Sequence, residues 1–244
     1  MSEYAPETYG DRIAEIYDAA YASLPTDAAV ETLAHLATGG PALELAIGTG
    51  RIAVPLAARG VEVHGIDASE AMVAKLREKP GGAEIPVTMG DFADVGVEGR
   101  YRLVYLVFNT FFALLSQADQ VRCFRNVAEH LTDDGVFVLE AFVPDLARFD
   151  RGQRVSTSRL DVNEVWIDAA IHDPVTQRVE SQHVVVTEAG VKLYPVNIRY
   201  AFPSELDLMA ELAGLRLRDR WAGWSREPFG KDSGIHVSVY ARAQ

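Results

Sequence analysis

The sequence predicts an α/β fold built on a doubly wound, mostly parallel seven-stranded sheet. Strand-like and helix-like segments alternate over residues 41–143, which is the pattern of a parallel sheet with helices on both faces. Residues 101–108 are almost all apolar, as in a strand that is covered on both faces. Residues 43–50 read Leu-Glu-Leu-Ala-Ile-Gly-Thr-Gly, a short apolar run that ends in a glycine turn.

Two helices are expected before the first strand. Residues 11–21 place Ile13, Ile16 and Ala20 on one side of a helix, so we predict that residues 1–25 form an amphipathic lid. A second helix begins after Thr26 or Asp27 and ends at the glycine pair 39–40.

Five strands of the sheet follow from residue 41 onward, with helices between them. Ser69 is expected to cap one of these helices, and Ser116 with Asp119 to cap another. The glycine turn leads into a helix over residues 51–59. The remaining strands are expected at residues 61–66, 86–89, 101–108 and 135–143.

The pattern changes after the fifth strand. Residues 160–202 alternate in β fashion and are broken by turn signals at 172–174 and 188–190, which predicts antiparallel hairpins. We interpret residues 155–203 as an insertion between strands five and six that covers the ligand edge of the sheet. Beyond it we expect a helix capped by Ser204, with Asp207 at the capping-box position, and two last strands at 215–221 and 235–241. Residues 1–244 then form one domain.

Composition excludes several classes of function. The chain has 244 residues and a formal net charge of −12, which argues against a nucleic-acid partner because phosphate binding rests on clustered Lys and Arg. A single cysteine, Cys123, rules out an internal disulfide or a multi-cysteine metal site, and the six histidines have no metal-binding spacing. The N-terminus lacks the features of a signal peptide, and no apolar run has the length of a membrane span. We expect a cytoplasmic protein without membrane or metal.

Polar residues stand where the predicted strands end. Glu44 lies within the first strand, Asp67 ends the second, Asp91 and Phe92 end the third, and Asn109 ends the fourth. Ligands of doubly wound sheets bind outside the carboxyl ends of the strands. A carboxylate after the second strand can accept bonds from ribose hydroxyls, and an Asp–Phe pair can meet an adenine. Together these residues predict a nucleoside pocket.

The glycine turn leaves two cofactors open. Gly48, Gly50 and Ala53 satisfy the dinucleotide pattern G-x-G-x-x-G/A, which indicates a nicotinamide-dinucleotide oxidoreductase. Glu44, however, would repel a pyrophosphate and suits a ligand that carries an ammonium or sulfonium charge.

The chain resembles the class I S-adenosylmethionine-dependent methyltransferases, whose fold is Rossmann-like. The resemblance rests on residues 43–50, on Gly-Ile-Asp-Ala-Ser at 65–69 with Met72, on Gly-Asp-Phe at 90–92 and on residues 131–135. The opening segment from Tyr9 to Asp18 resembles the lid helix of small-molecule enzymes, notably bacterial amino-sugar N-methyltransferases. Ala46 stands where many members have glycine.

This resemblance implies S-adenosylmethionine as cofactor and S-adenosylhomocysteine as product. Tyr9 and Tyr17 would close over the cofactor, Glu44 would lie near its amino group, and Arg12 is a weaker candidate for its carboxylate. The cofactor-binding residues that it implies are Tyr9, Tyr17, Glu44, Ala46, Gly48, Gly50, Asp67, Ala68, Met72, Asp91, Phe92 and Asn109.

The acceptor and the catalytic groups are less defined. The reaction is an in-line methyl transfer, most readily to nitrogen or oxygen of a small organic molecule. Catalytic candidates are Tyr9, Asn109, His183 and His236. Residues 108–114 are apolar after Thr110, where similar amino-sugar enzymes can place a polar catalytic residue, which favours an aromatic or apolar acceptor.

Two further expectations concern the variable part of the chain. Residues 221–233, with Trp221 and Trp224, are expected to wall the acceptor site. The alternating Val184, Val186 and Ile198 predict a homodimer interface on the insertion. Besides the oxidoreductase, the remaining alternative is a cofactor-binding protein without catalysis.

Overall fold

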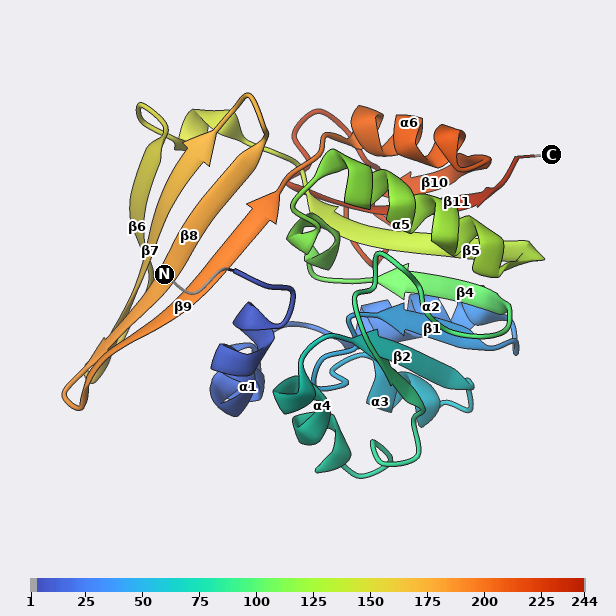
Figure 1. Cartoon of the computed structure of the whole chain (residues 1–244), viewed down its shortest axis with the longest axis horizontal. Helices are drawn as coiled ribbons and strands as arrows, with labels where there is room; N and C mark the ends of the chain where they lie inside the picture. Colours follow the sequence, from blue (N-terminus) through green and yellow to red (C-terminus); the bar gives the residue numbers. More distant parts are fainter. Residues whose placement is uncertain (1–3, 244) are drawn as a thin grey trace.

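The computed structural model describes residues 4–243 and contains two sheets (Figure 1). The larger has seven strands in the order β10-β11-β5-β4-β1-β2-β3. All neighbours pair in parallel except β11, which runs antiparallel to both β5 and β10. The strands are β1 (Ala42–Leu45), β2 (Val63–Asp67), β3 (Val87–Met89), β4 (Tyr101–Leu106), β5 (Leu131–Phe142), β10 (Leu215–Trp221) and β11 (Ile235–Arg242). The predicted fold class is confirmed.

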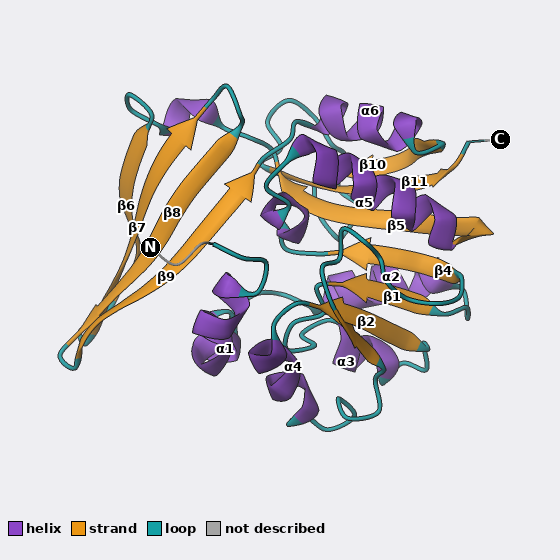
Figure 2. Cartoon of the chain, viewed as in Figure 1, coloured by secondary structure: helices purple, strands orange, loops and turns teal. Residues whose placement is uncertain are grey.

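Helices cover both faces of this sheet (Figure 2). Leu43 and Leu45 pack on one face with residues of α5 and α6, whereas Ala42 packs on the other with α2 and α3, because side chains alternate along a strand. None of the described helices is long and apolar enough to cross a membrane. The helices are α1 (Thr8–Ala20), α2 (Asp27–Ala37), α3 (Ala53–Ala57), α4 (Glu70–Arg77), α5 (Gln117–His130) and α6 (Pro203–Leu212), with short 3-10 turns η1 (Thr110–Ala113) and η2 (Leu146–Arg148).

The smaller sheet lies between β5 and β10 in the sequence and has four antiparallel strands in chain order. Its strands are β6 (Gln153–Leu160), β7 (Glu164–Asp173), β8 (Arg178–Thr187) and β9 (Gly190–Arg199). The predicted antiparallel insertion is therefore present, and β6 begins two residues before its expected start at residue 155. Figure 1 shows α1 between this sheet and α4, a helix that follows β2 of the larger sheet.

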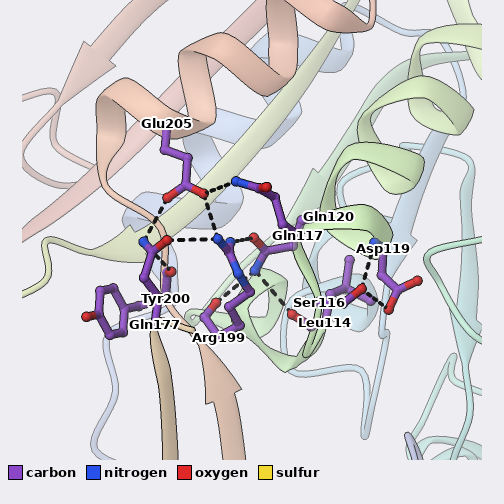
Figure 3. A network of polar contacts seen from close by, with 9 residues as sticks. All are labelled: Leu114, Ser116, Gln117, Asp119, Gln120, Gln177, Arg199, Tyr200 and Glu205. Atoms are coloured by element: carbon purple, nitrogen blue, oxygen red, sulfur yellow. Dashed lines mark hydrogen bonds and ion pairs between the residues drawn. The ribbon is translucent and has the colours of Figure 1, made fainter. Parts of the chain in front are cut away.

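A polar network joins the small sheet to the helical layer (Figure 3). Arg199, at the end of β9, donates to Glu205 of α6 over 2.7 Å and to Gln177 of the β7–β8 turn over 2.8 Å. It also donates to Gln120 of α5, whose side-chain amide returns a bond to the Arg199 carbonyl. Gln117 of α5 donates to Glu205 as well, over 2.8 Å. The network thus joins three segments that are distant in sequence, namely α5, the β7–β8 turn, and the end of β9 with α6.

Two of the four predicted helix caps are confirmed, whereas Thr26, at the start of α2, makes no side-chain capping hydrogen bond. The Ser69 hydroxyl accepts from the Met72 N–H, and the Ser116 hydroxyl accepts from the Asp119 N–H, so each satisfies a free donor of a first turn. Ser204 is not a cap, which is a correction. The helix begins one residue earlier with Pro203 after Phe202, because proline is suited to the first helical position.

Candidate functional site

The order of the strands reverses between β1 and β4, and a cavity of about 640 Å³ lies at their carboxyl ends. We call its two parts the cofactor half and the acceptor half. The cofactor half is lined by the segments that follow β1, β2 and β3, including residues 46–49, 67–69 and 91–92. The acceptor half is lined by the start of α1 and by residues of η1, β8 and β9.

The glycine turn shapes the floor of the cofactor half. Ala46 and Gly48 line the cavity, and both have a φ of +56°. Gly50 is not among the lining residues, which corrects its expected role. Its φ is +74°, and a Cβ at this position would lie 2.3 Å from Cδ1 of Leu76. Gly50 is therefore required by the packing of the turn against α4 rather than by ligand contact.

Glu44 is a buried carboxyl group on the wall of the cofactor half. The Tyr105 hydroxyl donates to it over 3.0 Å. Burial raises the pKa of Glu44 from 4.5 to about 8, although the hydrogen bond from Tyr105 and the charge of Arg51 oppose this shift. A cation bound in the cavity would stabilise the charged form. The site therefore fits a ligand with an ammonium or sulfonium group.

Asp67 holds the glycine turn and the start of α4 together. Its two oxygens accept from the Gly48 N–H over 2.7 Å and from the Ser69 N–H over 2.8 Å. Burial raises the pKa of Asp67, and these N–H groups oppose the shift. Each carboxylate oxygen retains a second acceptor position, so Asp67 can still bind ribose hydroxyls at the cavity wall.

The other predicted residues of the cofactor half also reach the cavity. Ala68, Met72, Asp91 and Phe92 all line it. Asp91 accepts from the Ala93 N–H over 2.8 Å, which fixes the turn that presents the Phe92 side chain. Both residues thus line the cavity just after β3, where a carboxylate and an aromatic ring can meet an adenine.

The backbone after β4 is strained where the two halves of the cavity meet. Phe108 and Asn109 have φ values of +57° and +65°, a conformation that costs non-glycine residues about 1–3 kcal/mol each. The Phe108 N–H donates to Glu140 over 2.6 Å, and the Asn109 side chain accepts from the Phe142 N–H over 2.6 Å. Strand β5 thus holds this turn in place, and both Phe108 and Asn109 line the cavity.

Helix α1 is bound to the loops of the cofactor half by two short hydrogen bonds. The Ser69 hydroxyl donates to Asp11 over 2.6 Å, and the Thr49 hydroxyl donates to Asp18 over 2.6 Å. Arg12 lies between them but is exposed and does not line the cavity, so it is removed from the candidates. Residues 1–3 of the predicted lid lie outside the described part of the chain.

Three tyrosines of the N-terminal segment close the cavity over the strand ends. Tyr9, Tyr17 and Tyr21 all line it, and the hydroxyls of Tyr9 and Tyr21 are 2.9 Å apart. Burial raises the pKa of Tyr9, and it raises that of Tyr17 to about 12 although Arg51 opposes the shift. These hydroxyls therefore remain protonated at neutral pH and act as donors.

Sequence reasoning missed Arg51. Among the described residues that line the cavity it is the only Lys or Arg, and its guanidinium carbon lies 5.3 Å from the centre of the Phe108 ring. Arg51 directly follows the glycine turn, at a point where a helix start already offers N–H donors to anions. That position in the sequence was the available signal that the Arg51 side chain reaches the cavity.

The structure separates the two histidine candidates. His183 lines the cavity, where its Nδ1 is hydrogen-bonded to Asp168. His236 does not line it. It is buried in β11, bonds to Ser238 over 2.8 Å, and burial lowers its pKa to about 4. His236 is therefore removed from the catalytic candidates.

The expectation that residues 221–233 wall the acceptor site is corrected. Trp221 and Trp224 pack with the core on the α2 side of the sheet, where Thr32 of α2 donates to the Trp224 carbonyl over 3.0 Å, and no residue of 221–233 lines the cavity. The apolar run after Thr110 reaches the cavity only in part. Phe111 and Phe112 are completely buried in the core, and Ala113 and Leu114 reach the cavity instead.

The chain is similar to known methyltransferases over its whole length. A family model described as a methyltransferase domain matches residues 42–135. The structure of the CcbJ methyltransferase from Streptomyces caelestis is 43% identical, with a TM-score of 0.93 over 99% of this chain and 100% of that chain. The cypemycin N-terminal methyltransferase of Streptomyces sp is 26% identical over 97% of this chain and 98% of its own length. The SAM-bound amino pentose methyltransferase CalS10 from Micromonospora echinaspora shares the fold, at 20% identity and a TM-score of 0.68 over 92% of this chain and 96% of that one.

The chain therefore belongs to the class I S-adenosylmethionine-dependent methyltransferases, and its activity is methyl transfer from this cofactor. These matches support neither the nicotinamide-dinucleotide oxidoreductase nor the cofactor-binding protein without catalysis. The buried Glu44 beside the glycine turn gives a physical reason to favour a cationic ligand, because a positive charge in the cavity would stabilise its carboxylate form, whereas a pyrophosphate would disfavour that form.

Proposed function

We propose that this protein methylates a nitrogen or oxygen atom of a small organic molecule. The observation that carries this proposal is the single cavity of about 640 Å³, which continues from the cofactor half into the acceptor half. This volume is typical of sites for small molecules, which are about 300–1,000 Å³. The acceptor half contains Tyr4, Thr110 and Asn197 beside apolar walls, so it suits an acceptor of mixed polarity.

In this proposal the chain's own residues bind and orient the two reactants. Glu44 would face the amino group of the cofactor, Asp67 its ribose, and Asp91 with Phe92 its adenine, while Arg51 would pair with its carboxylate. S-adenosylmethionine supplies an electrophilic methyl group on a sulfonium. Helix α1 acts as a lid that excludes water, and the β6–β9 sheet covers the acceptor, so that alignment and desolvation lower the barrier to displacement.

A label-transfer experiment tests the acceptor class. The protein is incubated with methyl-labelled S-adenosylmethionine and an extract of actinobacterial cells, and the products are separated into small molecules, peptides, proteins and nucleic acids. Label in the small-molecule fraction is expected. Label confined to peptides, proteins or nucleic acids would contradict the proposal. The Asp67→Ala variant serves as the control for background transfer.

We also propose a homodimer that forms through the outer face of the β6–β9 sheet. This face has exposed apolar side chains, with Val155, Leu160 and Ile171 at 75%, 77% and 66% exposure. Two copies that each carry a net charge of −12 can meet on this apolar patch, because Glu180, the carboxylate opposite Ile171 on the same face, is paired with Arg178 over 3.9 Å. Val184 shares this face, but Ile198 pairs opposite Val179 and lines the cavity instead, which corrects its expected position. Light scattering tests the proposal, and a monomer mass at every concentration would refute it.

We further propose that the protein works in the cytoplasm without nucleic-acid or membrane partners. The single cysteine, Cys123, is a buried free thiol, and burial raises its pKa to well above the ordinary value of 9.0. A protein with this cysteine usage is compatible with a reducing compartment. Fractionation of cells that express a tagged chain measures the location, and recovery in the culture medium would refute it.

A further inference from the structure

His183 and Asp168 form a polar pair in the wall of the acceptor half. They lie directly opposite each other on the neighbouring strands β8 and β7. Nδ1 of His183 is hydrogen-bonded to a carboxylate oxygen of Asp168. Their side chains are 26% and 30% exposed, respectively. The pair is therefore neither a core contact nor a freely solvated surface pair.

The hydrogen bond assigns the two ring nitrogens of His183 different roles. A carboxylate accepts hydrogen bonds, so Nδ1 carries a proton and donates it to Asp168. Nε2 is then the unprotonated nitrogen of the neutral ring. Among residues 4–243, no side chain or backbone group is hydrogen-bonded to this Nε2. A histidine in this arrangement has a free proton acceptor on a ring that lines the cavity.

The other ionisable groups that line the cavity are poorly suited to accept a proton from an acceptor molecule. Glu44, Asp67 and Asp91 lie in the cofactor half. Burial raises the pKa of Tyr9 and of Tyr17, so both remain protonated at neutral pH.

Asp119 accepts from the Ser116 hydroxyl over 2.6 Å and pairs with Arg122 over 2.6 Å at the start of α5. Each Asp119 oxygen therefore already accepts from one of these donors. Nε2 of His183, in contrast, accepts from no group of residues 4–243.

A second hollow of about 180 Å³ adjoins this pair and shares His183 and Tyr21 with the main cavity. It is lined on its far side by Asp168, Trp166 and Arg159. His183 thus stands between the acceptor half and a smaller space beside its own carboxylate partner. A proton that reaches the ring has a route to solvent that does not pass through the cofactor half.

We propose that His183 is the general base that removes the proton from the methyl acceptor, and that Asp168 is a positioning residue that holds its tautomer. This inference rests on the proposed function, because such a base is needed only when a small proton-bearing nucleophile occupies the cavity. It specifies the acceptor class as a hydroxyl compound or as an amine that enters as its ammonium form.

The proton and electron balance of the step is complete without another reactant. For a hydroxyl acceptor, a lone pair of its oxygen forms the bond to the methyl carbon as the carbon–sulfur bond breaks, and that electron pair remains on sulfur. The hydroxyl proton moves to Nε2 of His183. The imidazolium that results is paired with the Asp168 carboxylate. For an ammonium acceptor the same nitrogen of His183 removes one proton before attack, which frees the lone pair.

Charged and titratable groups from each neighbouring element face this pair. They are Arg159 of β6, Tyr21 just after α1 and Tyr194 of β9, which lies opposite His183 in the β8–β9 register. Arg159 is already paired with Glu164 over 3.1 Å. Asp168 contributes to the raised pKa of Tyr21, after the larger effect of burial. None of these groups replaces the carboxylate that accepts from Nδ1.

Nuclear magnetic resonance tests the tautomer without any acceptor. The ring nitrogens of ¹⁵N-labelled protein are measured in the complex with S-adenosylhomocysteine, and the His183 signals are assigned by their loss in His183→Asn. We expect a protonated Nδ1 and a bare Nε2 in the neutral ring, and a shift toward the Nε2–H tautomer in Asp168→Asn. A protonated Nε2 in the wild-type neutral ring would overturn the proposal.

Kinetics tests the catalytic role with the acceptor found by label transfer. We expect kcat at neutral pH to fall about 100-fold or more in His183→Asn, because general-base catalysis contributes about 10²–10⁴-fold, with an unchanged KM for S-adenosylmethionine. The acidic limb of the pH profile of kcat/KM should be lost. Asp168→Asn should lower kcat less than His183→Asn does. It should also alter the acidic limb of the pH profile of kcat/KM.

Matched controls distinguish a failure of the general-base assignment from a failure of the proposed function. His172 lies on β7, bonds to Tyr200 over 2.9 Å and does not line the cavity, so His172→Asn should retain wild-type kcat. Thermal unfolding confirms that each variant is folded. If the wild type labels no small molecule, the proposed function fails and the base assignment fails with it. If the wild type does label one and His183→Asn keeps kcat within about threefold, only the base assignment fails.

Discussion

The two halves of the cavity are built from different kinds of structure. In the cofactor half, short loops after parallel strands supply backbone N–H groups and carboxylates, and Asp67 accepts from the N–H groups of Gly48 and Ser69. In the acceptor half, a helix and an antiparallel sheet supply side chains such as His183, Val196 and Ile198. Binding in the first half therefore depends on the fold itself, whereas binding in the second half depends on side chains that can change without altering the fold.

The largest expected effect comes from breaking the contact between the β6–β9 sheet, which lines the acceptor half, and helix α6. Glu205→Ala removes the carboxylate from Arg199, whose side chain is 6% exposed, and should lower the free energy of unfolding by about 3 kcal/mol because a buried charge is left unpaired. Denaturant unfolding measures this change. Glu188→Ala, an exposed glutamate in the β8–β9 turn, is the control. A loss equal to that of the control would show that the network does not hold the β6–β9 sheet to α5 and α6.

The same pair predicts a pH dependence of stability. Burial alone would raise the pKa of Glu205, but hydrogen bonds from Arg199, Gln177 and Gln117 lower it below 4.5. A group with a lowered pKa in the folded state stabilises that state above its unfolded pKa. This contribution should be complete above about pH 4.5 and be lost as the pH falls through the lowered value. Glu205→Gln should remove this part of the acid dependence.

The next largest effect concerns the cofactor half alone. Asp67→Ala should weaken the binding of S-adenosylhomocysteine about 100-fold, because it removes a hydrogen-bonding charge from the wall and releases the Gly48 N–H. Calorimetry measures the affinity, and Asp67→Asn keeps the shape of the side chain if the alanine variant unfolds. Ile198→Ala in the acceptor half should change this affinity less than twofold. Equal losses in Asp67→Ala and Ile198→Ala would refute the division into halves.

Glu44 should give a smaller effect that depends on pH. Its pKa of about 8 in the ligand-free protein means that the carboxyl is mostly protonated at pH 7. A cationic ligand lowers this pKa, so binding should release a proton and should strengthen as the pH rises toward about 8. Calorimetry in buffers of different ionisation enthalpy detects the release. Glu44→Gln should abolish it and weaken binding about tenfold, the order of one charge-assisted contact.

Glu44 also affects the stability of the ligand-free protein. Because its folded pKa is raised from 4.5 to about 8, this group disfavours the folded state increasingly as the pH rises from about 4.5 to about 8. Thermal unfolding of Glu44→Gln should show less loss of stability over this range than the wild type. An identical pH profile for both proteins would contradict the raised pKa.

The smallest effect is expected at Ala46. Its φ of +56° costs an alanine about 1–2 kcal/mol, whereas glycine adopts this conformation freely but loses about 0.5–1 kcal/mol through chain entropy. Ala46→Gly should therefore raise the free energy of unfolding by at most about 1.5 kcal/mol and retain cofactor affinity. A loss above 1 kcal/mol would show that the methyl group of Ala46 is needed for packing.

The sequence predicts the cofactor half well because its chemistry requires particular residue types at strand ends. Glu44, Asp67 and Asp91 were expected there and all reach the cavity. The role of Gly50 was not predictable in this way, because its close approach to Leu76 depends on how α4 packs behind the turn.

The residues that line the acceptor half could not be predicted from the sequence, for a different reason. An alternating pattern shows that β8 and β9 have two faces, but it does not show which face meets the cavity. Ile198 was therefore assigned to the wrong face, and the pairing register settles it. His236 was a catalytic candidate as a histidine on a terminal strand, and Trp224 was expected to wall the acceptor site because residues 221–233 are aromatic and loop-like. The antiparallel pairing of β11 with β5 instead buries His236, and Trp224 packs with the core on the α2 side of the sheet.

Helix α1 contributes to both halves of the cavity. Hydrogen bonds from Ser69 and Thr49 hold it against the loops of the cofactor half, and its Tyr9 side chain and the following Tyr21 also line the cavity. Because one helix bounds both halves, we expect its release to open both together. The spent cofactor and the methylated product would then leave in the same event, and the rate of that release would set an upper limit on turnover.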